Sequence, residues 1–164
     1  MKPRIFGVDP GTLSTGYAVI EEVDGRWLPL DFGCIQPPIK IEIQHRYLAI
    51  LNALHHLMER YRPEAVAVET QFLYKNFQSV LKLGMARGVV LIAAAQHEIP
   101  LFEYAPTKVK LALTGKGSAS KEQVQRMTQV VFNLPQLPPK DAADALALAL
   151  CHAHTQSCNR AFLE

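Results

Sequence analysis

Cysteine is scarce in this sequence and long hydrophobic runs are absent, and each shortage excludes a class of protein. Three cysteines in 164 residues are an odd number without paired spacing, which argues against a disulfide framework. The longest apolar run covers residues 88–95, far short of the roughly 20 residues that a membrane-spanning helix needs. Residues 1–4 lead directly into a strand-like segment, without the hydrophobic region of a signal peptide. We therefore expect a soluble, cytoplasmic protein.

Linkers, internal repeats and low-complexity segments are also missing from the sequence. Hydrophobic residues make up 49% and charged residues 20%, a balance that excludes a disordered or fibrous chain. The length suits one domain with a substantial core, so a single domain over residues 1–164 is predicted.

The net charge of +2 conceals an uneven distribution along the chain. Residues 1–69 have a net charge of −2, residues 70–130 of +5 and residues 131–164 of −1. A basic middle segment can be the footprint of a polyanion, although on charge alone a solvated helix surface is the favoured explanation.

The hydrophobic periodicity predicts an α/β fold. Strands are expected at residues 5–8, 16–20, 27–35, 65–68 and 101–104. Helices are expected at residues 43–61, 77–97, 107–113, 120–132 and 141–154. The first three strands, joined by short turns such as Asp24-Gly25, indicate an antiparallel meander. Helices separate the later strands, which suits parallel pairing and gives a mixed five-stranded sheet flanked by helices.

Four carboxylates stand at element ends in this pattern. Asp9 ends the first strand, Glu69 ends the fourth, and Asp141 and Asp144 lie three residues apart on one face of the last helix. If strands one and four are parallel neighbours, all four side chains can converge.

Converging carboxylates repel one another unless a cation lies among them, and hard oxygen ligands favour Mg²⁺ or Mn²⁺. Two such ions about 3.5–4 Å apart clamp the attacking and leaving oxygens of a phosphodiester displacement and supply the nucleophilic water. Taken singly, Asp9 is an ordinary turn residue, Glu69 a strand-end residue and Asp141 a helix-start residue. Together, the four carboxylates indicate a catalytic metal-binding site.

The order and spacing of these residues match a known family. The matching segments are Gly7-Val8-Asp9-Pro10-Gly11, Thr15-Gly16, Val68-Glu69, Asn76, Ser79, Ala86-Arg87-Gly88, Val109-Lys110, Gly115-Lys116-Gly117-Ser118-Ala119 and Asp141-Ala142-Ala143-Asp144-Ala145-Leu146-Ala147. From about Phe6 to His154 the chain resembles the RuvC-type Holliday-junction resolvases, which are crossover junction endodeoxyribonucleases. The resemblance implies a ribonuclease-H-like fold, a homodimer, and Mg²⁺-dependent cleavage of four-way DNA junctions in recombination and repair. It also implies RuvA and RuvB, the branch-migration complex, as partners.

The resemblance assigns further site residues. By motif, Asp9, Glu69, Asp141 and Asp144 are the metal-binding catalytic residues. Lys110 and Lys121 match the family's lysines near the active site, where a positive charge can hold the scissile phosphate. Phe72 matches an aromatic position used at the unpaired bases of the junction, and core packing is its alternative role.

Other signals leave alternatives open. Lys116, in a Gly-rich loop without the spacing of a nucleotide-binding loop, is interpreted as a DNA contact, with a plain surface loop as the alternative. Cys151, His154 and Cys158 share one helix face but lack a fourth zinc ligand at matched spacing. Two other functions remain: an actin-like nucleotide-binding domain, suggested by Asp9-Pro10-Gly11-Thr12, and a catalytically inactive junction-binding module. The predicted dimer interface involves either helix 43–61 or helix 77–97.

Overall fold

A five-stranded sheet forms the centre of the protein, and the computed structural model describes residues 2–70 and 77–161. The strands are β1 (Arg4–Asp9), β2 (Thr15–Val23), β3 (Arg26–Ile35), β4 (Ala65–Glu69) and β5 (Leu101–Tyr104). Their order in the sheet is β3-β2-β1-β4-β5. The first three strands pair antiparallel, and β1–β4 and β4–β5 pair parallel. The predicted meander and parallel pairings are therefore confirmed.

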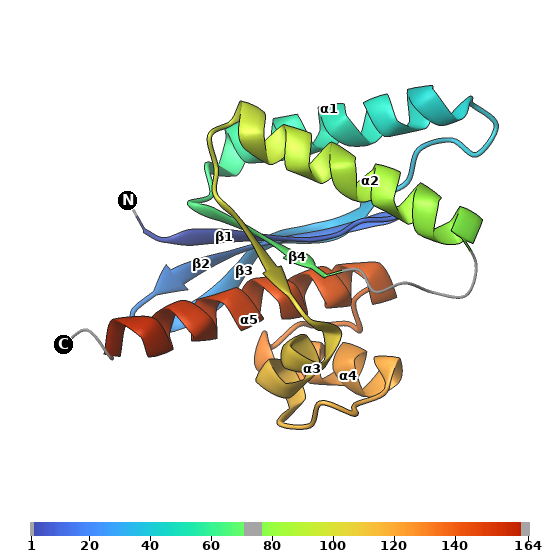
Figure 1. Ribbon diagram of the computed structural model, residues 1–164. Coiled ribbons are helices and arrows are strands. Elements are labelled where there is room, and N and C mark those ends of the chain that lie inside the picture. The colour runs from blue at the N-terminus through green and yellow to red at the C-terminus, as the bar shows by residue number, and fades with distance from the viewer. Residues whose placement is uncertain (1, 71–76, 162–164) are drawn as a thin grey trace.

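Helices cover both faces of this sheet (Figure 1). They are α1 (Ile43–Tyr61), α2 (Phe77–Gln96), α3 (Pro106–Thr114), α4 (Lys121–Val131) and α5 (Lys140–Ala161). Figure 1 shows α1 and α2 on one face and α5 on the other, with α3 and α4 packed on the outer side of α5. The predicted helices are all present, but α5 continues seven residues beyond the expected end at His154, to Ala161.

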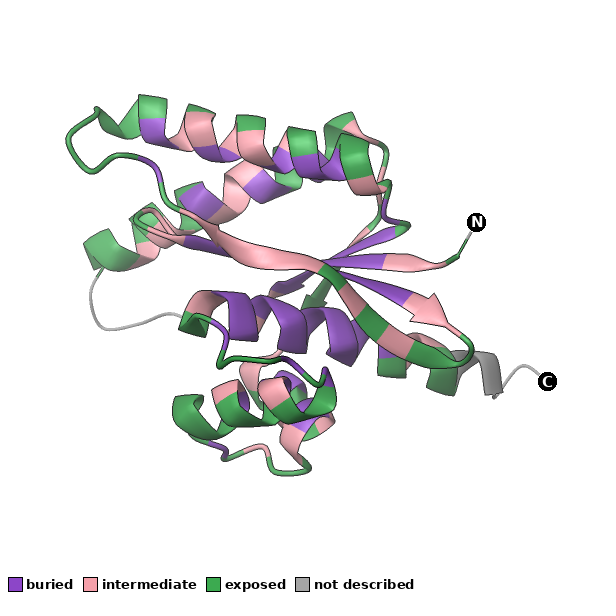
Figure 2. Cartoon of the chain, turned by 180° about the vertical axis from the view of Figure 1, so that it is seen from behind, coloured by how far each residue is buried: buried purple, intermediate pink, exposed green. Residues whose placement is uncertain are grey.

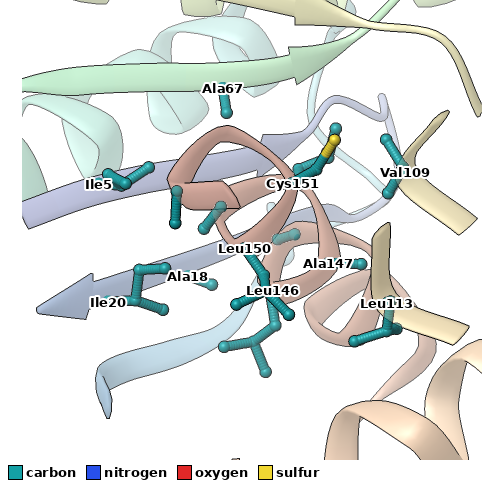
Figure 3. Packing of buried hydrophobic residues seen from close by; sticks show 14 of the residues in the cluster. Ile5, Ala18, Ile20, Ala67, Val109, Leu113, Leu146, Ala147, Leu150 and Cys151 are labelled. Carbon is teal, nitrogen blue, oxygen red and sulfur yellow. The ribbon is translucent and has the colours of Figure 1, made fainter. Parts of the chain in front are cut away.

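Alternate side chains of β1 supply the two halves of the core. Ile5 packs with α5, whereas Phe6 and Val8 pack with α1 and α2, because neighbouring residues of a strand point to opposite faces. Figure 3 shows the α5 side, where Ile5, Ala18 and Ile20 from the sheet meet Leu146 and Leu150. Side chains from the sheet and from α5 thus form one continuous layer of the core.

Helix α5 is buried on nearly all sides between its start and Ala153, and Figure 2 shows this as an almost continuous purple band. A helix apolar all round is typical of a position between two layers, here the sheet on one side and α3 with α4 on the other. Within this helix Asp141 and Asp144 are only partly buried. Solubility does not explain the presence of two carboxylates in so apolar a helix.

Helix α4 begins with a capping box. The Ser120 hydroxyl accepts a hydrogen bond from the Gln123 backbone N–H at 3.2 Å, and the Gln123 side chain accepts one from the Ser120 backbone N–H at 2.8 Å. This cap sets where α4 begins, and therefore where Lys121, its first residue, lies.

Helix α2 differs from the sequence-based expectation. By length and composition it is apolar enough to cross a membrane, which the uninterrupted run of residues 88–95 did not indicate. This is a weak signal, since core helices of soluble proteins pass the same test. Ala86, Val90, Ala93 and Ala94 of α2 pack inward, and a second apolar face of the helix stays exposed.

Candidate active site

Asp9 and Glu69 lie at the same edge of the sheet because β1 and β4 are parallel neighbours. Val8 is paired with Val68 in the strand register, and each carboxylate follows directly in the chain. The hydrophobic residues before them are fully buried, so the strands deliver both carboxylates from the core to the sheet edge. The predicted side-by-side arrangement is confirmed.

Helix α5 reaches the same edge by lying against the backbone of β1 and β2. A Cβ atom on Gly7 would lie 2.0 Å from the carbonyl oxygen of Ala145, and one on Gly16 would lie 2.0 Å from that of Asp141. Only glycine fits at these two positions. The glycines therefore set the height of α5 over the sheet, and with it the position of Asp141 and Asp144.

A hollow of about 200 Å³ opens where these elements meet. We call it the carboxylate hollow; it is lined by Asp9, Glu69, Pro106, Val109, Lys110, Lys121, Val124, Asp144 and Leu148. Five of the residues predicted for the site therefore line one cavity. Asp141 lies at its margin: its charge acts on Asp9 and Asp144, but its side chain borders a neighbouring hollow.

Burial and mutual repulsion make the carboxylates hard to ionise. Burial and the charges of Asp144, Glu69 and Asp141 raise the pKa of Asp9 to about 8. Burial and the neighbouring Asp144 also raise the pKa of Glu69, and burial raises that of Asp144. Such a concentration of negative charge in a confined space favours binding of a cation.

Lys110 and Lys121 compensate part of this charge. Lys121 partly offsets the rise in the pKa of Asp9, Glu69 and Asp144, and Lys110 partly offsets that of Glu69 and Asp144. Lys121 occupies the first turn of α4, where the helix dipole disfavours a positive side chain. Its position is therefore explained by the carboxylates opposite rather than by the helix that contains it.

The donor set of the carboxylate hollow fits a hard divalent cation, since all its acidic ligands are oxygens. In the described ranges, however, no three acidic, histidine or cysteine side chains are already close enough together to hold one ion. The charges of Asp9, Glu69 and Asp144 nevertheless act on one another, which shows that these carboxylates share one region of the site.

One of the predicted DNA contacts, Lys116, does not line this hollow. Lys116 lies in the loop after α3, where Gly115 takes a left-handed conformation at φ 73°. Lys116 lines a separate hollow of about 320 Å³ with Arg126, Met127 and Val130. Phe72 lies outside the described residues.

The cysteine-rich end of α5 does not form a metal site in the described part of the chain. Cys151 is buried, whereas His154 and Cys158 are exposed. Cys151 and Cys158 are separated by two helical turns, about 10 Å, too far for two short thiolates to share one ion.

One residue that the sequence interpretation missed is Arg46, which lies buried on the apolar side of α1. A signal for it exists in the sequence, since Arg46 falls three residues after Ile43 and four before Ile50, on the hydrophobic stripe. A charged residue on that stripe needs a polar partner.

The fold and the site together define an α/β protein of the ribonuclease-H-like class with an acidic cavity at the sheet edge. Residues 5–152 match the sequence model of the family described as "Crossover junction endodeoxyribonuclease RuvC". The chain belongs to the RuvC family.

Individual relatives agree with this assignment. The chain is 53% identical over 150 residues to the crossover junction endodeoxyribonuclease RuvC of Protochlamydia amoebophila, covering 91% of this chain and 89% of that protein. It is 46% identical over 159 residues to that of Chlamydia trachomatis serovar L2, covering 94% and 93%. The structure is similar to that of Thermus thermophilus RuvC in complex with a Holliday junction substrate, with a TM-score of 0.88 and 36% identity over 96% of each chain.

Proposed function

We propose that this protein is a structure-selective endonuclease that resolves four-way DNA junctions by paired, Mg²⁺-dependent phosphodiester hydrolysis. The observation that carries the proposal is the convergence of Asp9, Glu69 and Asp144 with Lys110 and Lys121 in one hollow. The relatives named above are crossover junction endodeoxyribonucleases, and one was solved with a Holliday junction. No feature of the site favours the actin-like or the inactive junction-binding alternative.

The carboxylates would bind the catalytic cation, with Asp9 and Asp144 on opposite elements and Glu69 beside Asp9. We propose Mg²⁺, or Mn²⁺ in its place, and two ions per site. When bound, such ions activate a water molecule and stabilise the leaving oxygen. Asp141, at the margin, supports the set through its charge and completes it when its side chain turns inward.

The lysines would act on the substrate rather than on the ion. The scissile phosphate carries a negative charge into a hollow that is itself acidic, and Lys110 and Lys121 are the positive groups in its lining. They can hold the phosphate and offset the charge that develops on its oxygens during displacement. Both lysines come from helices outside the sheet, so they approach from the side opposite β1 and β4.

The test is incubation of the purified protein with a synthetic four-way junction, with and without Mg²⁺. Symmetrically placed nicks on opposing strands that appear only with the divalent ion support the proposal. Intact junction in the presence of Mg²⁺, with the protein shown to be bound, contradicts it. A linear duplex of the same sequence serves as the control for structural selectivity.

A homodimer follows from the same proposal, because one chain has one carboxylate hollow and a junction has two opposing strands to cut. Of the two helices considered, α2 offers the better surface. Its exposed apolar side chains, Phe77, Leu81, Met85 and Ile92, follow one helical stripe. Gly84 and Gly88 lie beside them, and a Cβ atom on either would meet nothing within 4 Å. A second α2 could therefore approach closely.

Sedimentation equilibrium tests this interface. The double substitution Leu81→Glu with Met85→Glu should convert a dimer into a folded monomer that no longer makes paired cuts. Val130→Glu, at an apolar position that is 71% exposed on α4, is the matched control and should leave the dimer intact. A dimer that survives both changes on α2 would place the interface elsewhere.

The remaining proposed contacts rest on the family resemblance. Phe72 is proposed to stack on unpaired bases at the junction centre, and Lys116 to contact a DNA arm from its loop. The branch-migration proteins RuvA and RuvB are proposed as partners. Co-migration of this protein with both on a junction in native gels, compared with each protein alone, tests that proposal.

A further inference from the structure

A second hollow, of about 560 Å³, lies on the other side of Asp141 from the carboxylate hollow. We call it the Arg46 hollow. The β1–β2 loop forms one wall through Thr12 and Ser14, α1 contributes Arg46, and α2 contributes Lys82. Asp141 borders this hollow, and Asp144, one helical turn later, borders the carboxylate hollow. The two hollows are therefore neighbours along α5.

Arg46 is a buried cation without a counter-ion. Its side chain belongs to a residue only 7% exposed, and its Nη2 donates a hydrogen bond to the Thr12 carbonyl oxygen at 2.9 Å. Its Nε is buried and has no hydrogen-bond partner, and within residues 2–70 and 77–161 no carboxylate lies within 4.0 Å of the guanidinium. Buried charges are ordinarily paired, because desolvation without a partner is costly.

Two other arginines show what Arg46 lacks. Arg4 donates from Nε to a Glu21 carboxylate oxygen at 2.8 Å, and Arg87 forms an ion pair with Glu103. Both are more exposed than Arg46 and still have an acidic partner. The Ser14 hydroxyl, in the wall of the same hollow, is likewise buried without a partner. The hollow is thus lined by a buried cation to which the described residues bring no carboxylate within 4.0 Å, and this charge favours an anion there.

We propose that the Arg46 hollow binds a phosphate of the DNA strand next to the scissile phosphate, with Arg46 as its buried charge partner and Lys82 at the rim. This inference rests on the proposed nuclease function and adds a positioning site to it. Asp141 and Asp144, which border the two hollows, are neighbours on one face of α5. A DNA strand that follows this face can therefore place phosphates in both hollows.

The Asp141 carboxylate explains why a strand phosphate is the occupant rather than free phosphate. A negative group at the border repels a small anion, whereas a phosphate tethered to its neighbour in the carboxylate hollow is held there by the rest of the strand. Anchoring the strand on both sides of the scissile bond fixes the reacting phosphate in position.

Salt-dependent junction binding tests the proposal. Binding is measured with Mg²⁺ in an Asp144→Asn background, so that the junction stays intact. Lys82→Ala and Arg46→Gln should each weaken binding on the order of three- to tenfold and reduce the slope of log K against log salt by about 1. Arg26→Ala removes an exposed charge at the β2–β3 hairpin, the opposite end of the sheet, and should change neither quantity.

Arg46→Gln alone is ambiguous if it unfolds the protein, so thermal unfolding of each variant is recorded. Lys82 is exposed, and its substitution leaves the core untouched. An unchanged salt slope in a folded Lys82→Ala variant and in a folded Arg46→Gln variant overturns the proposal. Cleavage of the junction by the wild-type protein, recorded in parallel, tests the nuclease function separately.

Neutral methylphosphonate groups, placed one at a time around the cleavage point, then locate the contact. One position should weaken binding of the Arg46-containing protein and have no further effect on Arg46→Gln. If Arg46 only holds the β1–β2 loop in place, the loss of binding caused by each methylphosphonate adds to the loss caused by Arg46→Gln at every position. That result would contradict the proposal. Thermal stabilisation by inorganic phosphate that depends on Arg46 would instead identify a free-phosphate site and overturn the strand assignment.

Discussion

Acidic groups lie at both ends of β1, and the two differ in whether a charged partner lies beside them. At its start, Arg4 is paired in the sheet with Glu21, and the two side chains form a 2.8 Å ion pair. At its end, Asp9 is paired with Gly16, and the part of the chain that the structure describes offers it no ion pair within 4.0 Å. At one end the chain itself supplies the counter-charge, whereas at the other the carboxylate has no ion-pair partner among the described residues and its pKa is raised to about 8. The difference separates a carboxylate that stabilises the fold from one that we propose to be catalytic.

The largest expected effect compares Asp9→Asn with Glu21→Gln. Asp9→Asn should reduce junction cleavage at least about a thousandfold, because it removes a proposed ligand of the activating cation, while junction binding is largely retained. Glu21→Gln should leave the cleavage rate of the folded protein within a few fold. Single-turnover cleavage assays with gel-shift binding measure both. Equal losses of cleavage rate in the two variants would contradict the proposed difference between the two ends of β1.

A smaller effect is expected from Lys121, which partly compensates the acidic end. Lys121→Ala should lower the single-turnover cleavage rate on the order of 10- to 100-fold, the range for loss of an electrostatic contact to developing charge. Lys108→Ala is the matched control: Lys108 lies on α3, and its Nζ is 5.0 Å from the centre of the Tyr104 ring instead. A control as impaired as Lys121→Ala would show that the effect is not specific to the lysine that lines the carboxylate hollow.

The metal-free stability should depend on pH through Asp9. Its pKa is raised from 3.8 to about 8 in the folded protein, so the unfolded chain releases this proton first as the pH rises. The folded state therefore loses stability progressively between pH 4 and pH 8, and the loss stays constant above pH 8. In EDTA, Asp9→Asn should raise the melting temperature at pH 8 by roughly 4 °C or more and have little effect near pH 4.

Thermal unfolding followed by circular dichroism measures this pH dependence. The complementary experiment repeats the measurement in the presence of Mg²⁺. The ion should stabilise the wild-type protein at pH 8 and stabilise Asp9→Asn much less. An Asp9→Asn variant less stable than the wild type at pH 8 without metal would show that Asp9 serves the fold, as Glu21 does.

The smallest expected effect concerns the paired end. Glu21→Gln leaves Arg4 without its carboxylate in a partly exposed position, where the Arg4 side chain is 27% exposed. We expect a loss of about 1–2 kcal/mol in the free energy of unfolding, because solvent screens part of the interaction. Urea denaturation measures it, and the double variant Arg4→Met with Glu21→Gln completes a cycle that isolates the pair. A stabilised single variant would contradict the neutralising role.

The sequence by itself determined the elements and the chemistry of the site. Strand and helix periodicities predicted the order of all ten elements, and Asp9, Glu69, Asp141 and Asp144 were recognisable because each carboxylate interrupts or ends an apolar segment. Local patterns of this kind depend on neighbours a few residues away, which the sequence shows directly.

Only the tertiary structure decided which of these residues share a cavity. Lys110 and Lys121 face the carboxylates whereas Lys116 does not, and Asp141 borders the Arg46 hollow rather than the carboxylate hollow. The close contacts of Gly7 and Gly16 with α5 and the unpaired state of Arg46 join segments far apart in the chain. Periodicity carries no information about such distances, because they are set by how the sheet and α5 pack together.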